Sequence, residues 1–188
     1  FIGSNASGDA SLTPATVGQV MVGALINATS EPASDNIIGT NGDGISDDLE
    51  GNLITGGAVA IAISQPGSVN NRISGNIIGL DVSRNLIFPP QVGIAIEGPN
   101  TLVGSDNNGV NDDLEGNLIG SATDSGIVIV GGVTGNRLSR NHVYGVNALG
   151  IDLNDDGVTP NDEDDGDSGP NNLQNTPILT GALNGGET

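Results

Sequence analysis

The sequence predicts an all-β solenoid, in which short parallel strands stack in successive coils around an apolar bore. Three observations predict this fold. A long segment recurs at a fixed offset, short strands with alternating apolar residues recur along the chain, and asparagines precede these strands at repeated positions. Such repeats indicate stacked units, because each unit buries its apolar face only against its neighbours.

The longest repeat has an offset of 65 residues. Residues 37–54 read IIGTNGDGISDDLEGNLI, and residues 102–119 read LVGSDNNGVNDDLEGNLI. The shorter run NRIS at 71–74 recurs at the same offset as NRLS at 136–139. Two matches at one offset indicate a duplicated structural unit rather than chance similarity.

A finer unit of three strands lies inside this repeat. Alternating strands at 61–63, 94–96, 127–129 and 151–153 are spaced by 33, 33 and 24 residues. Three short strands in a minimal unit of about 24 residues match one coil of a parallel β-helix, with extra residues inserted at turns. Three walls of the bore are expected from Ile61, Ile63, Ile94, Ile96, Ile127, Ile129, Ile151 and Leu153, from Ile38, Ile73, Val103 and Leu138, and from Ile54, Ile78, Ile119 and Val143.

Asparagines in front of the strands form two predicted columns. One column contains Asn36, Asn71, Thr101 and Asn136, and the other contains Asn52, Asn76, Asn117 and Asn141. Asparagine tolerates left-handed backbone, and its amide can bond to the turn of the next coil. We therefore interpret these residues as stacked ladders, with ordinary turn asparagines as the alternative.

Several segments resemble a known family. Residues 35–41 (DNIIGTN), 71–79 (NRISGNIIG) and 1–8 (FIGSNASG) resemble runs found in bacterial secreted or cell-surface proteins with right-handed parallel β-helix repeats. Residues 150–162 (GIDLNDDGVTPND) and 171–175 (NNLQN) are similar to the acidic run that closes such domains. The resemblance covers nearly the whole chain. It implies a right-handed helix and a secreted or surface location, but no particular reaction, since the family shares a scaffold rather than an activity.

The same reading divides the chain into two parts. Residues 1–153 are expected to form the coils, and residues 154–188 an acidic C-terminal cap or linker towards a following module. Both ends look cut, because residues 1–3 begin inside a coil and residues 178–180 resemble the start of another module. We therefore expect a fragment of a longer chain.

Two acidic insertions occupy the same corner of the predicted coil. The spacing between the asparagine columns is 16 residues from Asn36 to Asn52 and from Thr101 to Asn117. It is 5 residues from Asn71 to Asn76 and from Asn136 to Asn141, so 11 residues are inserted each time. We call residues 40–51 the first acidic loop and residues 105–116 the second acidic loop. They are expected two coils apart, roughly 9.6 Å along the axis.

These insertions and a third run approach the pattern of a calcium-binding loop. Oxygen-rich side chains packed this closely suit Ca²⁺, which takes 6–8 oxygen ligands. The predicted ligands are Asn41, Asp43, Asp47 and Glu50 in the first loop, Asp106, Asn108, Asp112 and Glu115 in the second, and Asp152, Asn154, Asp156 and Glu163 in the third run.

The match to the calcium pattern is incomplete. Gly39 and Gly104 replace the first aspartate, Pro160 interrupts the third run, and no amphipathic helix flanks any of the three. The alternative is a solvated acidic surface or an adaptation to salt. Residues 152–167 carry eight acidic side chains. Without a counterion we expect this segment to be disordered, whereas calcium would allow it to fold and cap the solenoid.

The charge balance excludes several partners. The net charge is −19, with four arginines, no lysine and no cysteine. Nucleic acid is excluded because phosphate binding depends on Lys and Arg. Membrane insertion is not expected, because no apolar stretch approaches ~18 residues, and the absence of cysteine excludes disulfides and thiolate chemistry.

Enzymatic alternatives have weak support. Paired acids such as Asp47-Asp48 and Asp112-Asp113 exist, but glycosidases need one carboxylate in an apolar pocket. A lyase would use a base such as Arg72 or Arg137 beside calcium. The only histidine, His142, is expected at an outward strand position in line with Leu118.

The sequence thus predicts a non-catalytic, calcium-binding structural or adhesive module of a secreted or cell-surface protein. Its expected partners are other modules of the same chain or neighbouring copies, with a surface glycan as a further candidate. The alternatives are a polysaccharide lyase or glycoside hydrolase-like enzyme, and a subunit of a self-assembling extracellular filament.

Overall fold

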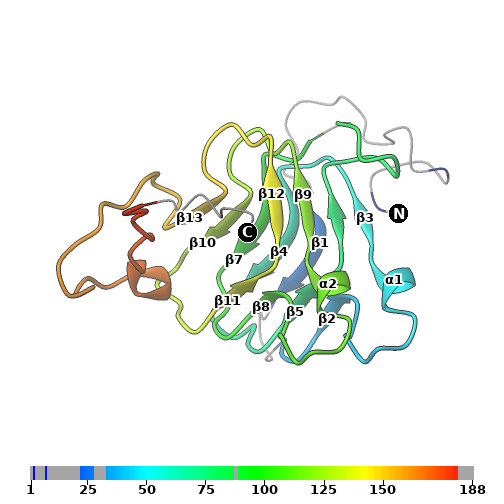
Figure 1. The fold of residues 1–188 in the computed structure, drawn as a ribbon, viewed down its shortest axis with the longest axis horizontal. Helices are drawn as coiled ribbons and strands as arrows, with labels where there is room; N and C mark the ends of the chain where they lie inside the picture. The colour runs from blue at the N-terminus through cyan, green and yellow to red at the C-terminus, as the bar shows by residue number, and fades with distance from the viewer. Residues whose placement is uncertain (1, 3–6, 8–21, 28–32, 87–88, 182–188) are drawn as a thin grey trace, which may run out of the picture.

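The computed structural model describes residues 2, 7, 22–27, 33–86 and 89–181 (Figure 1). The described strands are β1 (Val22–Asn27), β2 (Ile37–Gly39), β3 (Leu53–Ile54), β4 (Val59–Ser64), β5 (Arg72–Ser74), β6 (Ile77–Ile78), β7 (Val92–Ile96), β8 (Leu102–Gly104), β9 (Leu118–Gly120), β10 (Ile127–Ile129), β11 (Arg137–Ser139), β12 (His142–Tyr144) and β13 (Ile151–Leu153). The described helices are the single turns α1 (Asp47–Glu50), α2 (Asp112–Glu115) and η1 (Pro170–Leu173).

The strands form three parallel sheets, which confirms the predicted parallel, solenoid-like arrangement. Their orders are β1-β4-β7-β10-β13, β2-β5-β8-β11 and β3-β6-β9-β12. Each sheet therefore takes one strand from each successive coil, and the four coils are β2-β3-β4, β5-β6-β7, β8-β9-β10 and β11-β12-β13. Strand β1 adds a fifth member to the first of these sheets. Its sequence was not among the expected strands.

The strands pair in the register that the repeats predict. Ile61 pairs with Ile94, which pairs with Ile127 and then Ile151. Identical positions in successive coils therefore stack directly above one another. This is the expected outcome when every coil has to present its apolar residues to the same bore.

The core is a column of aliphatic side chains between the sheets. The fully buried members are Ile54, Ala60, Ile61, Ile63, Ile73, Ile78, Ile94, Ile96, Val103, Ile119, Ile127 and Ile129. In the last coil, Leu138, Val143 and Leu153 are only partly buried, and Ile151 is 50% exposed. Exposure rises there because the last coil has a neighbouring coil on one side only.

Asparagines connect the coils by hydrogen bonds at both predicted columns. Asn52 donates its backbone N–H (3.1 Å) and its side-chain amide (3.0 Å) to Asn76 Oδ1, and Asn76 does the same to Asn117 Oδ1 (3.0 Å each). Asn117 continues to Asn141 in the same way. Asn76 and Asn117 are buried, so these amides satisfy backbone groups that water does not reach.

The other column extends further than expected. Asn36 donates to Asn71, Thr101 donates its N–H to Asn136 Oδ1 (2.8 Å), and Asn136 donates its N–H to Asn171 Oδ1 (3.0 Å). Asn171 returns a 2.7 Å bond from its amide to the Asn136 carbonyl. Residue 171 therefore occupies the ladder position of a further coil, so the end segment docks on the stack through the same interaction.

Two glycines allow the coils to approach at the corner that bears the acidic loops. Gly39 and Gly104 have φ of 103° and 94°. A Cβ at Gly39 would lie 1.8 Å from the Ser74 carbonyl oxygen, and one at Gly104 would lie 1.9 Å from that of Ser139. Glycine is required at both positions for the left-handed backbone and for the close contact.

Candidate functional site

The first acidic loop is held by hydrogen bonds within itself. Asp47 is buried: its Oδ1 accepts from the Thr40 hydroxyl at 2.8 Å, and its Oδ2 accepts from the Gly44 N–H at 3.0 Å. Glu50 Oε2 accepts the Asn41 N–H at 3.0 Å. Predicted calcium ligands therefore serve as acceptors for backbone and hydroxyl groups of their own loop.

The second acidic loop repeats this pattern and adds arginines. Glu115 Oε2 accepts the Asp106 N–H at 3.0 Å, the counterpart of the bond to Glu50. The Glu115 side chain is fully buried, and its Oε1 lies 2.7 Å from Arg72 Nη2. Arg72 Nη1 lies 3.2 Å from Asp106 Oδ2. Arg72 thus compensates the charge of two predicted ligands from the coil below.

A second arginine lies on the outer side of the same loop. Arg140 contacts Asp112 at 3.4 Å and Asp113 at 2.5 Å. Arg137 donates to the Asp106 carbonyl at 2.8 Å. The oxygens of Asp106, Asp112 and Glu115 lie within 4.8 Å of one another, so the structure brings three of the four predicted ligands together. This trio already has two guanidinium groups as counterions.

The two loops touch across the coil that separates them. Asn111 of the second loop donates to Asp47 Oδ2 of the first at 3.0 Å, and α1 contacts α2 (Figure 1). Hydrogen bonds from the Asn111 amide and the Thr40 hydroxyl hold the pKa of Asp47 below its usual value, against the opposing effect of burial. A Cβ on Gly42 would lie 2.1 Å from Glu115 Oε1, so the loops pack without spare space.

The predicted ligands of the third run, Asp152, Asn154, Asp156 and Glu163, are not arranged as the calcium-loop pattern requires. Asp152 is 4% exposed, and its Oδ2 accepts the Gly157 N–H at 3.2 Å. Asn154 donates to Asp156 Oδ2 at 2.8 Å, and both are exposed. Glu163 is exposed and belongs to neither of the two groups of converging carboxylates in the described chain.

A different trio converges in the acidic segment. Oxygens of Asp162, Asp165 and Asp167 lie within 4.8 Å of one another. Burial, followed by the carboxylates of Asp162 and Asp165, raises the pKa of Asp167 above its usual value. The described ion pairs of the chain all involve Arg72 or Arg140, so none of them neutralises this trio. The sequence pattern did not single out these three residues together.

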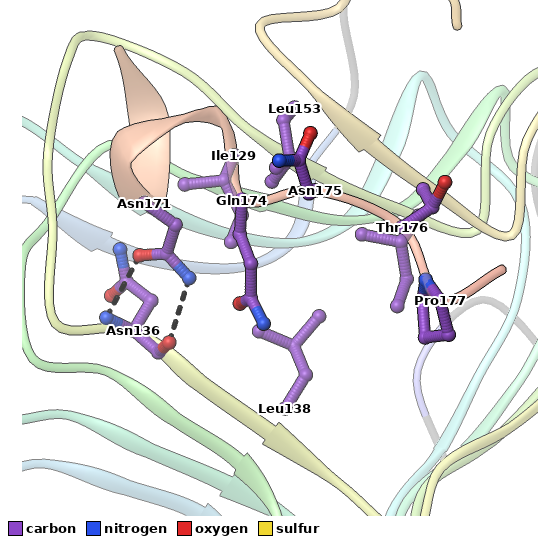
Figure 2. A pocket seen from close by; sticks show the side chains of 10 residues that line it. Ile129, Asn136, Leu138, Leu153, Asn171, Gln174, Asn175, Thr176 and Pro177 are labelled. Atoms are coloured by element: carbon purple, nitrogen blue, oxygen red, sulfur yellow. Dashed lines mark hydrogen bonds between the residues drawn. The ribbon is translucent and has the colours of Figure 1, made fainter. Parts of the chain in front are cut away.

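The acidic segment and the residues after it lie at the end of the coil stack (Figure 1). Asn161 donates to the Thr176 carbonyl (2.8 Å), and Asn175 donates its N–H to Asp165 Oδ1 (3.0 Å). A pocket of about 270 Å³ lies beneath, between the last coil and residues 171–177. Figure 2 shows Asn171 bonded to Asn136 at one side of this pocket, with Leu138, Ile129 and Leu153 lining it. The segment thus only partly fills the end of the bore.

A shallow groove lies over the second acidic loop. It has a volume of about 430 Å³ and is lined by Gly109, Asn111, Asp112, Asp113, Leu114 and Arg140. Polar groups dominate it, and the guanidinium that it contains is paired with two aspartates. His142 is exposed and pairs in register with Leu118. In the described part of the chain, no helix is long and apolar enough to cross a membrane.

The arginines are the site residues that sequence reasoning missed. Arg72 and Arg137 were considered only as the base of a lyase, whereas Arg72 and Arg140 form the ion pairs of the second loop. Arg72 lies at the register position between Ile37 and Leu102, and its guanidinium reaches Glu115 of the next coil. The alternation of Ile37, Arg72, Leu102 and Arg137 in this column was the available signal.

Comparison with known proteins adds no relative. No family model, no curated protein and no solved structure matches this chain.

Proposed function

We propose that this chain is a non-catalytic structural module of a secreted or cell-surface protein, built as a closed right-handed parallel β-helix. It would act as a stalk or adhesive spacer that carries other modules. The observation that carries this proposal is the stacking of four coils, which are joined throughout by the ladder of Asn52, Asn76, Asn117 and Asn141. The other asparagine column continues into the end segment at Asn171.

Calcium is the proposed ligand of the acidic segment. Residues 152–167 contain eight acidic side chains, and none of them takes part in the described ion pairs. Like charges held this closely repel one another, and a divalent cation with a preference for oxygen relieves that repulsion. We propose that calcium binding orders the acidic segment behind the last coil, so that residues 154–188 act as a cap.

Calcium binding by the two acidic loops stays a prediction. Their carboxylates are engaged by backbone N–H groups, and those of the second loop also by Arg72 and Arg140. These contacts explain how the loops hold their shape, because the chain itself supplies the partners of their carboxylates. A calcium ion in the second loop would have to displace Arg72 from Glu115.

Thermal unfolding in EDTA and then in a calcium series tests the structural proposal. Extracellular calcium modules bind with Kd of roughly 10⁻⁴–10⁻³ M. At about 1 mM calcium, each such site adds roughly 0.4–1.4 kcal/mol. A saturable rise of the melting temperature supports the proposal, and magnesium at the same ionic strength is the control. Superimposable melts in EDTA and calcium would remove calcium from the proposal.

The second candidate function is an enzyme acting on an acidic polysaccharide. The groove over the second acidic loop favours it, because it places Arg140 beside Asp112 and Asp113. A lyase would need a free basic group, and Arg140 is held by both aspartates. Incubation with uronate polymers, followed by absorbance of the unsaturated product, distinguishes the two candidates. Calcium-dependent product formation that Arg140→Ala abolishes would establish the enzyme and contradict the structural proposal.

A further inference from the structure

Residues 161–177 are held together as one unit, which we call the end lid. Asn175 donates its N–H to Asp165 Oδ1 at 3.0 Å and its side-chain amide to the Asp162 carbonyl at 2.9 Å, and its Oδ1 accepts the Asp162 N–H at 3.0 Å. Asn161 donates its amide to the Thr176 carbonyl at 2.8 Å, and its Oδ1 accepts the Thr176 N–H at 2.8 Å. The two ends of the end lid therefore move together unless all of these bonds break.

One residue joins the end lid to the coils by hydrogen bonds. Asn171 donates its N–H to the Val133 carbonyl at 2.8 Å and its side-chain amide to the Asn136 carbonyl at 2.7 Å, and its Oδ1 accepts the Asn136 N–H at 3.0 Å. In the described part of the chain, every other hydrogen bond of the end lid stays within residues 161–177. The end lid thus has one latch, and the side chain of Asn171 supplies two of its three bonds.

The latch makes only part of the contact that joins the coils to one another. In every other rung formed by two asparagines of the described columns, the first residue donates both its N–H and its side-chain amide to one Oδ1 of the next. Asn136 donates only its N–H to Asn171, and its Nδ2 has no partner in the described chain although the residue is 8% exposed. A buried amide without a partner is unfavourable. The end lid therefore lies short of the position that would complete the rung.

Space and a hinge for this movement are both present. A pocket of about 270 Å³ lies between Gln174 and Thr176 of the end lid and Leu138 of the last coil (Figure 2). A second pocket, of about 250 Å³, is lined by the same coil and by residues 157–159. Residues 158–160 precede the end lid and form no hydrogen bond in the part of the chain that the structure describes. Such backbone opens at a low cost in free energy.

We propose that the end lid swings about residues 158–160 and closes over the end of the bore as one unit, with Asn171 as its latch. Closure completes the rung at Asn136 and shields Leu138 and Leu153. Opening exposes these side chains together with the free edges that β11 and β13 have in the described sheets, and such edges are where strands of other chains pair. The end lid therefore controls access to the end of the stack. This inference rests on the proposed calcium-ordered cap, and it names the contact that holds the cap closed.

Hydrogen exchange of the 188-residue chain, measured by mass spectrometry in millimolar calcium, tests the latch. The variant is Asn171→Gly, and Asn172→Gly is the matched control. Both residues have left-handed backbone, with φ of 48° and 58°, which glycine adopts freely, but the Asn172 side chain forms no hydrogen bond in the described chain. Peptides covering the end lid should exchange at least about 10-fold faster in Asn171→Gly, because two bonds of the latch are lost. Asn172→Gly should match the wild-type chain.

A second variant tests whether the end lid is one unit. Asn175→Ala removes the bonds of that side chain to Asp162 and leaves the latch in place. Residues 161–167 should then exchange faster, while residues 171–174 keep the wild-type rate. Unchanged exchange of residues 161–167 in this variant would show that the two ends of the end lid are not coupled, and the single unit would be wrong.

The remaining outcomes separate the latch from the cap. Equal protection of the end lid in Asn171→Gly and wild type would overturn the latch and leave the calcium-ordered cap standing. Equal acceleration in Asn171→Gly and Asn172→Gly would assign the effect to the backbone of the turn, which also overturns the latch. If the end lid of the wild-type chain exchanges freely in calcium while β4, β7 and β10 stay protected, both the end lid and the proposed cap fail.

Discussion

Replacement of Arg72 by leucine would remove the cation that faces the buried carboxylate of Glu115. The strand itself should tolerate the change, because the neighbouring coils carry Ile37 and Leu102 at the same register position. Glu115 would then remain fully buried with one oxygen still bonded to the Asp106 N–H and the other without its 2.7 Å partner. The effect on stability therefore reports the ion pair rather than the fit of the side chain.

The expected loss is about 3–5 kcal/mol, because removal of one partner leaves an uncompensated buried charge. Arg72 keeps 15% of its side chain exposed, so water offsets part of the loss and the lower end of this range is expected. For a chain of this length, about 3 kcal/mol corresponds to a fall in melting temperature of roughly 6–12 °C. Urea unfolding followed by circular dichroism gives the free energy, and a melt gives the temperature.

Two comparisons make the result specific. Arg137→Leu changes the equivalent residue of the last coil, which donates to a backbone carbonyl of the second loop and forms none of the ion pairs in the described part of the chain. It should cost less than about 1 kcal/mol. The double variant Arg72→Leu, Glu115→Gln removes the stranded charge and should recover at least half of the loss. An Arg72→Leu protein within about 1 kcal/mol of wild type would refute the assignment of this pair as a buried charge contact.

Three further predictions concern the ladders, the corners and the first acidic loop. Asn117→Ala should lower the free energy of unfolding by at least about 2 kcal/mol, because it strands the buried N–H of Asn76 and the buried carbonyl of Ile73 in the neighbouring coil. Asn36→Ala at the exposed end should cost far less in the same urea assay. Gly104→Ala should lower the melting temperature of the protein by more than Gly109→Ala does. Both glycines have positive φ, but only at Gly104 would a Cβ meet a backbone carbonyl, so equal losses would contradict the packing argument. The folded-state pKa of Asp47 is lowered, so the stability that its carboxylate contributes is present above its usual pKa of 3.8 and is lost as the pH falls through the lower folded value. In urea unfolding measured across this pH range, Asp47→Asn should therefore lose less stability on acidification than the wild-type chain does. An unchanged dependence of stability on pH would contradict this role of Asp47.

The regular part of the fold was predictable because a stack of coils is nearly one-dimensional. Each position meets its counterpart in the next coil, so the 33-residue spacing of the alternating strands predicts the register of Ile61, Ile94 and Ile127 directly. The 65-residue offset does the same for Ile38 and Val103, which both pair with Ile73. The same reasoning missed β1, because Ala24 stands where the other strands of this sheet carry the first isoleucine of their alternating pair. It also missed Asn171 as a ladder member, because this residue follows an acidic segment rather than a strand.

The candidate site was harder to predict because its contacts run between coils. The acidic loops were recognised by composition, but the linear calcium pattern counts residues along the chain. Arg72 reaches Glu115 across 43 positions, and Asn111 reaches Asp47 across 64. Whether a loop carboxylate faces an arginine, an amide or open solvent depends on what the next coil places above it. That information is absent from any single loop.

Hydrogen exchange measured by mass spectrometry, in EDTA and in millimolar calcium, tests the central claim most directly. The account predicts that peptides from β4, β7 and β10 are protected in both conditions, because their hydrogen bonds and core do not depend on the ion. Peptides covering residues 152–177 should exchange rapidly in EDTA and become protected as calcium is added. Identical exchange of residues 152–177 in both conditions would contradict a calcium-fixed cap, and rapid exchange of the three strands in calcium would contradict the stacked module itself.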